Sequence, residues 1–247
     1  MLSACVGRVR TQPGSSSIAA NVCGMQNGRV NVIVAPRVLT HFSLFSPPPC
    51  SPPFFLLCAG IPACVPQVGS DTCTTFSYTP APRDGFVPDA DYATLDEFKA
   101  GIAVDGKSVC TRTWNTATAA YVDITCAAAD CDVVGGACAA CCATYRTHKV
   151  VRGMMALNGT SAEGVYYPIP AANVMGFTNE TQLDTYILDN PGNIPGGVLF
   201  NSVSENKTSF VVQHNSTVQN VRNQYEDKFS TFTLPLQLAA HKAILRR

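Results

Sequence analysis

Short apolar runs separated by polar segments are clearest in the last third of the chain. Residues 197–203 and 208–213 are short runs rich in Val and Phe, and the polar segment 204–207 separates them. Runs of this length and composition predict two strands joined by a turn. Residues 234–245 are mostly Leu, Ala and Ile, and Pro235 lies near the first turn, where a missing N–H costs little. The pattern predicts a strand pair followed by a short helix with a broad apolar face.

Two further helices are predicted upstream. Residues 91–100 carry apolar side chains near helical spacing. A second helix is expected to begin after an N-cap at Thr178 and to present Leu183 and Ile187 on one face. The segment 189–192, Asp-Asn-Pro-Gly, ends that helix.

The segment from Gly101 to Ser108 matches the P-loop pattern, in which backbone N–H groups, a Lys and a Ser bind nucleotide phosphates. A P-loop follows a buried strand and opens a helix, but residues 95–100 hold three charges and residues 109–114 are β-branched and aromatic. Residues 102–110 read instead as a hairpin around the Asp105-Gly106 turn. Nucleotide binding is therefore the weakest of the hypotheses.

Charge divides the chain unevenly. Residues 1–70 contain four Arg and no acid, whereas residues 71–247 hold all 17 acids against 13 bases. We predict a disordered leader over 1–70, a cysteine-rich and loop-rich region over 71–150 and an α+β segment over 151–247. The apolar run 54–61 is too short to span a membrane, which takes about 20 residues.

Crowded cysteines indicate a disulfide framework in an oxidising compartment. The chain has 12 cysteines. The adjacent pair Cys141-Cys142 argues for two different partners. The disulfide candidates are Cys73, Cys110, Cys126, Cys131, Cys138, Cys141 and Cys142.

Zinc is the alternative to disulfides in this region. Cys138 and Cys141 offer one ligand pair, and Cys126 and Cys131 could complete four thiolates. Disulfides are favoured because the spacing is not a doubled C-x-x-C. Trp114, the single tryptophan, is expected to pack near the cystines.

N-glycosylation sequons exceed the number expected by chance, which favours a secretory or cell-surface location. Their asparagines are Asn158, Asn179, Asn206 and Asn215.

Catalytic patterns are thin. The four histidines show no metal-ligand spacing, and neither G-x-S-x-G nor H-E-x-x-H occurs. The small basic cluster of Arg146, His148, Lys149 and Arg152 is typical of a solvated surface and not of nucleic-acid binding. We therefore expect no enzyme, no cofactor or metal in this chain, and no nucleic-acid partner.

Residues 173–245 resemble the end of the first extracellular domain of the A subfamily of ATP-binding cassette (ABC) transporters, the lipid exporters. The resemblance is carried by Gly176-Phe177 and the helix after it, by the strand pair, and by the Leu234-Pro235-Leu236-Gln237-Leu238-Ala239 segment. It implies a fragment of an extracellular or lumenal domain on a membrane. The partners would be the remainder of the transporter and a lipid or amphiphile, with neither transport nor ATP hydrolysis by this chain alone.

A secreted, disulfide-rich glycoprotein binding module is the alternative. The two hypotheses differ over the last helix. A secreted module would pack the helix from Pro235 on its own core. A transporter fragment would let it project with its apolar face exposed.

Overall fold

The structure is a computed structural model. It describes residues 21–26, 29–34, 60–65, 73–127, 130–131, 136, 138–190, 193–204, 207–214, 220–221, 224–225 and 229–246. Of these, the backbone alone is described at 21–26, 29–34, 111, 113, 220–221, 224–225 and 229–230.

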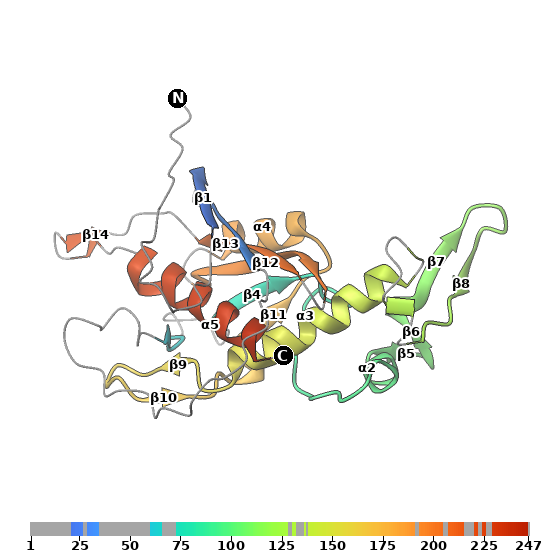
Figure 1. Ribbon diagram of the computed structural model, residues 1–247, viewed down its shortest axis with the longest axis horizontal. Helices are drawn as coiled ribbons and strands as arrows, with labels where there is room; N and C mark the ends of the chain where they lie inside the picture. The colour runs from blue at the N-terminus through green and yellow to red at the C-terminus, as the bar shows by residue number, and fades with distance from the viewer. Residues whose placement is uncertain are drawn as a thin grey trace, which may run out of the picture.

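A six-stranded mixed sheet is the centre of the fold (Figure 1). Strand β4, next to the edge strand β11, runs parallel to both of its neighbours, and the remaining pairs are antiparallel. In spatial order the strands are β1 (Asn21–Gln26), β2 (Arg29–Val34), β13 (Thr208–His214), β12 (Gly196–Val203), β4 (Phe76–Thr79) and β11 (Val174–Gly176). The predicted strand pair is confirmed as β12 and β13.

Helices cover both faces of this sheet (Figure 1). The α-helices are α2 (Leu95–Gly101), α3 (Ala139–Met155), α4 (Glu180–Asp189) and α5 (Leu234–Leu245). Short helical turns are η1 (Val109–Thr111), η3 (Ala171–Asn173) and the π-helical η4 (Phe229–Thr233). The predicted α+β class is confirmed.

Successive residues of β12 point to opposite faces of the sheet, as a strand requires. Val198 and Phe200 belong to the large core beneath α3 and α5. Leu199 faces the other way, into a smaller core with Leu183 and Ile187 of α4. Two separate apolar clusters therefore hold the helices to the two faces.

The last helix packs on the core of its own domain. Leu236, Ala239, Ala240 and Ala243 of α5 are buried. A Cβ atom built at Gly153 of α3 would lie 3.0 Å from the Ala243 Cβ, so small residues let the two helices approach closely. The expectation that this helix projects with its apolar face exposed is wrong.

Helix α4 begins one residue later than predicted. Asn179, and not Thr178, is the N-cap, and its Oδ1 accepts a hydrogen bond of 3.0 Å from the Gln182 N–H. The Thr178 hydroxyl donates to Asp84 at 2.9 Å instead. Leu183 and Ile187 are buried as predicted.

The P-loop alternative is wrong. Gly101 ends α2 instead of opening a phosphate loop, and the strands β5 (Ala103–Val104) and β6 (Lys107–Ser108) follow as a hairpin. Asp105 and Gly106 have φ values of 54° and 71°, as a type I′ turn needs. Helix α2 is preceded by a capping box between Thr94 and Glu97.

The remaining strands form small sheets. They are β10 (Tyr166–Tyr167), β9 (Gly159–Thr160) and β3 (Ile61–Pro62) in one, β7 (Arg112–Asn115) with β8 (Ala120–Asp123) in another, and β14 (Asn220–Val221) with β15 (Gln224–Tyr225) in a third.

Strands from all three predicted segments share the central sheet. Within 1–70, β2 pairs with β13, and β3 pairs with β9. From 71–150, β4 lies between β12 and β11. The sheet therefore includes described strands from all three predicted segments. Most of the predicted leader lies outside the described residues, so the division at 70 stays a prediction.

Candidate functional site

Four cysteine pairs lie at disulfide geometry. The pairs, with their Cα–Cα distances, are Cys64–Cys73 (5.8 Å), Cys110–Cys141 (4.8 Å), Cys126–Cys138 (5.6 Å) and Cys131–Cys142 (5.4 Å). All seven predicted disulfide candidates are among them, and Cys141 and Cys142 do bond to different partners. Cys64, which the sequence placed in the leader, is the eighth. Because these eight cysteines bond in pairs, they do not form a thiolate set for zinc, and the described residues hold no group of three potential metal ligands.

Three of these disulfides converge on the start of α3. Cys138, Cys141 and Cys142 occupy its N-cap and first turn, and each bonds to a cysteine 11 to 31 residues earlier in the chain. Lys99 of α2 donates to the Cys126 carbonyl, which adds a polar contact to the same junction. The loops before the helix are thus fixed by covalent bonds, and the cystines at the helix start are buried in the large core.

Two cysteines of this framework flank the hairpin β7–β8 in the sequence. Cys110 precedes β7, Cys126 follows β8, and both are bonded to α3. We call residues 112–123 the arm. Figure 1 shows the arm projecting from the end of the molecule near the start of α3.

The arm exposes its aromatic residues. Trp114 pairs with Tyr121 across the strands, with ring centroids 5.0 Å apart in an edge-to-face arrangement. Their exposed fractions are 54% and 64%. The expectation that Trp114 packs near the cystines is wrong, because the cystines hold only the base of the arm.

Beyond the framework, α3 buries a histidine. His148 lies among the rings of Phe86, Tyr92 and Phe98, at centroid distances of 5.2–6.0 Å. Its Nε2 is 3.0 Å from the Ala90 carbonyl oxygen, which places the proton of the neutral ring there. Burial, above all, lowers the pKa of His148 to about 4. His148 is therefore a core residue and not part of a solvated basic cluster.

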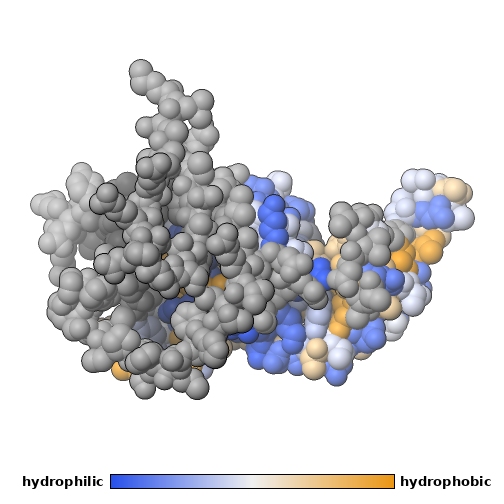
Figure 2. Space-filling model, in the orientation of Figure 1, coloured by the Kyte–Doolittle hydropathy of each residue, from blue (hydrophilic) through white to orange (hydrophobic). Residues whose placement is uncertain are grey.

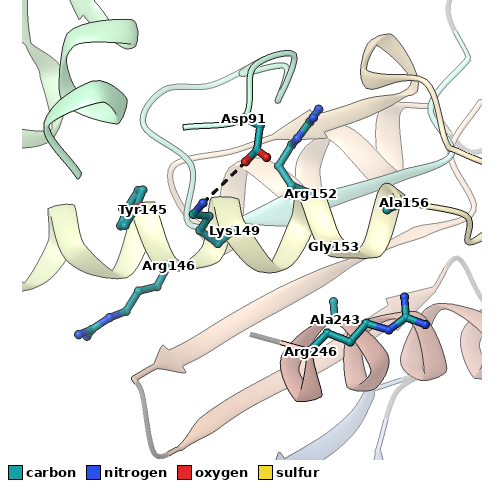
Figure 3. A pocket seen from close by; sticks show the side chains of 9 residues that line it. All are labelled: Asp91, Tyr145, Arg146, Lys149, Arg152, Gly153, Ala156, Ala243 and Arg246. Carbon is teal, nitrogen blue, oxygen red and sulfur yellow. Dashed lines mark ion pairs between the residues drawn. The ribbon is translucent and has the colours of Figure 1, made fainter. Parts of the chain in front are cut away.

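The other members of that cluster line a groove of about 620 Å³ over the contact between α3 and α5. Gly153, Ala156 and Ala243 form part of its lining, and Arg246 at the end of α5 adds a cation that the sequence did not group with the others. Figure 3 shows Lys149 directed toward Asp91, and Arg146 and Arg246 directed toward different ends of the groove.

Most of these cations have internal partners. Lys149 lies 3.7 Å from Asp91, Arg146 donates to the Cys131 carbonyl at 3.3 Å, and Arg152 donates to the Pro88 carbonyl at 3.2 Å. Carbonyl oxygens do not neutralise the charge of an arginine. The groove therefore keeps a net positive charge, which favours anions as ligands. Arg152 and Arg246 also lie at helix C-termini, where a cation stabilises the helix dipole.

The sequon asparagines differ in exposure. Asn158 is buried, and its Nδ2 donates to the Gly153 and Ala156 carbonyls at 3.2 and 2.9 Å. Asn179 is exposed and caps α4 through Oδ1, while its Nδ2 donates to the Thr178 hydroxyl oxygen at 3.4 Å. Asn206 and Asn215 lie outside the described residues. Glycosylation stays a prediction, and the folded geometry favours Asn179 over Asn158.

The described helices include none with both the length and the hydrophobicity needed to cross a bilayer.

Comparison with known proteins supports the resemblance seen in the sequence. The chain is similar to ABC transporter A family members 11, 2 and 9 of Arabidopsis thaliana, with 37%, 35% and 32% identity over 79, 78 and 79 residues. The matched segment is 32% of this chain and 8% of each relative. No protein-family model matches the chain, and no solved structure matches it. The predicted resemblance to ABC transporters of the A family is therefore confirmed over about a third of the chain.

Proposed function

We propose that this chain is part of the extracellular or lumenal domain of an ABC transporter of the A family. The similarity to three such transporters carries the proposal. The cystine framework supports the lumenal side, because disulfides persist in oxidising compartments. In this proposal the whole transporter exports lipids or other amphiphiles, and this chain forms a rigid cap with no transport or ATPase activity of its own.

Sequencing the full-length transcript across both ends of the reading frame tests the assignment. The proposal expects it to continue into an apolar stretch of about 20 residues and then a nucleotide-binding cassette. A transcript that encodes only this chain would contradict the transporter assignment.

Glycosidase digestion tests the side of the membrane. When the full-length protein is expressed in a eukaryotic host, digestion is expected to increase its gel mobility. Asn179→Gln should remove one glycan, whereas Asn158→Gln should leave the glycan number unchanged, because the Asn158 amide is buried and hydrogen-bonded. A protein with no glycan at any sequon would contradict lumenal exposure of this segment.

A secreted binding module remains the second candidate function, and one observation favours it. Helix α5 buries its apolar face against α3, as a domain that folds on its own would do. Fractionation separates the two candidates: a secreted module is recovered from the medium, and a transporter domain stays with the membrane.

A further inference from the structure

An exposed hairpin such as the arm is not expected to be stable in water without further support. A two-stranded hairpin alone is marginally stable in water, and all four residues of β8 are exposed. Two disulfides hold its base to α3. Covalent cross-links therefore hold an element whose residues do not belong to the apolar core. This indicates that the arm itself contacts another molecule or surface.

Apolar side chains are exposed on both faces of the arm. Trp114 and Tyr121 share one face, because they are paired across the strands. Val122, with an exposed fraction of 43%, alternates to the opposite face together with Ala120. Figure 2 shows apolar surface on this projecting part of the molecule. A protein docking on the hairpin would cover one face, whereas a fluid apolar medium would contact both.

Charge is confined to the base of the arm. Arg112 and Asp123 are paired there, with Nε and Oδ1 3.4 Å apart, and Arg112 also lies 5.7 Å from the centre of the Tyr121 ring. No residue between them, from 113 to 122, is charged. A neutral tip bearing Trp and Tyr is suited to the boundary between lipid headgroups and acyl chains, where these amphipathic rings are enriched.

We propose that the arm inserts its tip, residues 113–122, into the interface of a lipid bilayer. Insertion stops at the headgroup region, because the outer edges of the hairpin carry backbone N–H and C=O groups that hydrocarbon cannot satisfy. The paired charges at the base stay in water. The proposal extends the assignment to a membrane transporter but does not require it, since insertion depends on the arm alone.

Trp114 is the only tryptophan, so its fluorescence reports on the arm. The oxidised chain is mixed with phosphatidylcholine vesicles and, separately, with vesicles that also contain phosphatidylserine. We expect a blue shift of the emission with both, and quenching by brominated acyl chains. Val122→Asp should lower vesicle partitioning about tenfold or more, because it places a carboxylate on the inserted tip. Val165→Asp adds the same charge at an exposed valine outside the arm and should leave partitioning unchanged.

Two results would overturn the proposal. One is an unchanged emission with both vesicle types while thiol titration and circular dichroism show an oxidised, folded chain. The other is binding only to the phosphatidylserine vesicles that salt and the Arg152→Glu, Arg246→Glu double variant abolish, which would assign binding to the basic groove. Either result leaves the transporter assignment intact, since the transcript tests that separately.

Discussion

The central sheet and the arm are stabilised in opposite ways. The sheet buries large side chains on both faces, among them Phe76, Phe210 and Leu199, without a disulfide between its strands in the described residues. The arm buries almost nothing and depends on the cystines at its base. Hydrophobic burial fixes one region and covalent cross-linking fixes the other, so each should respond to a different perturbation.

Truncating a core ring should break the sheet. Phe210 is fully buried and packs against Phe200 and His241, with ring centroids 5.9 and 5.4 Å away. Phe210→Ala should lower the free energy of unfolding by about 3–5 kcal/mol, because it leaves a cavity. Urea denaturation followed by circular dichroism measures the change.

Trp114→Ala is the matched control for the arm. It removes a larger but exposed ring and should change the free energy of unfolding by less than about 0.5 kcal/mol. Equal losses in the two variants would mean that the arm is part of the cooperative core.

Removing one cystine should release the arm and spare the sheet. Cys126–Cys138 closes a short loop, and its loss through the double variant Cys126→Ser, Cys138→Ser should cost about 3 kcal/mol, mostly at the base of the arm. Hydrogen exchange should rise at residues 110–127 and stay slow in β12 and β13. Uniform loss of protection would contradict independent stabilisation of the two regions.

The sequence predicted the sheet better than the arm because periodicity is a local signal. Strands β12 and β13 and helix α4 were found within a residue or so, since each carries its own apolar pattern. The insertion of β4 between β12 and β11 was not predicted, because a parallel pairing between distant segments leaves no local trace.

The arm and the groove were missed for related reasons. Cysteine spacing does not determine connectivity, so neither the pairing nor the use of Cys64 could be derived. The β-branched and aromatic residues in 109–114 do not show by themselves whether their side chains reach a core. Arg246 meets Lys149 and Arg152 only because α5 packs on α3, and that depends on Gly153 and Ala243 being small.

Acid should lower the free energy of unfolding through His148. This residue of α3 lies beneath the loop that leads to α2. The pKa of His148 is lowered to about 4, first by burial and then by the positive charges of Arg152 and Lys149, against the opposing effects of the Ala90 carbonyl and Asp91. Between about pH 6.5 and pH 4 the unfolded chain binds the proton more readily, so stability falls as pH falls. The loss of unfolding free energy over this range is about 3 kcal/mol.

Chemical denaturation at a series of pH values measures this loss. His148→Phe should reduce the decline between pH 6.5 and pH 4 while leaving the decline at lower pH, which carboxylates cause. An unchanged profile would show that His148 does not titrate on unfolding.

The smallest expected change in stability comes from removing a single tyrosine hydroxyl, either from Tyr78 in the sheet or from Tyr145 on α3. Tyr78 of β4 is buried, and burial raises the pKa of its phenol. Its hydroxyl has no hydrogen-bond partner among the described residues, so Tyr78→Phe removes an unsatisfied polar atom and should stabilise the sheet by about 1 kcal/mol.

Tyr145 of α3 is the matched control, because its hydroxyl donates to the Ala93 carbonyl at 2.9 Å. Tyr145→Phe should destabilise the chain by about 0.5–1 kcal/mol. Urea denaturation measures both changes in the free energy of unfolding. Changes of opposite sign would show that the hydroxyl on α3 is hydrogen-bonded and the one in the sheet is not, and changes of the same sign would contradict this.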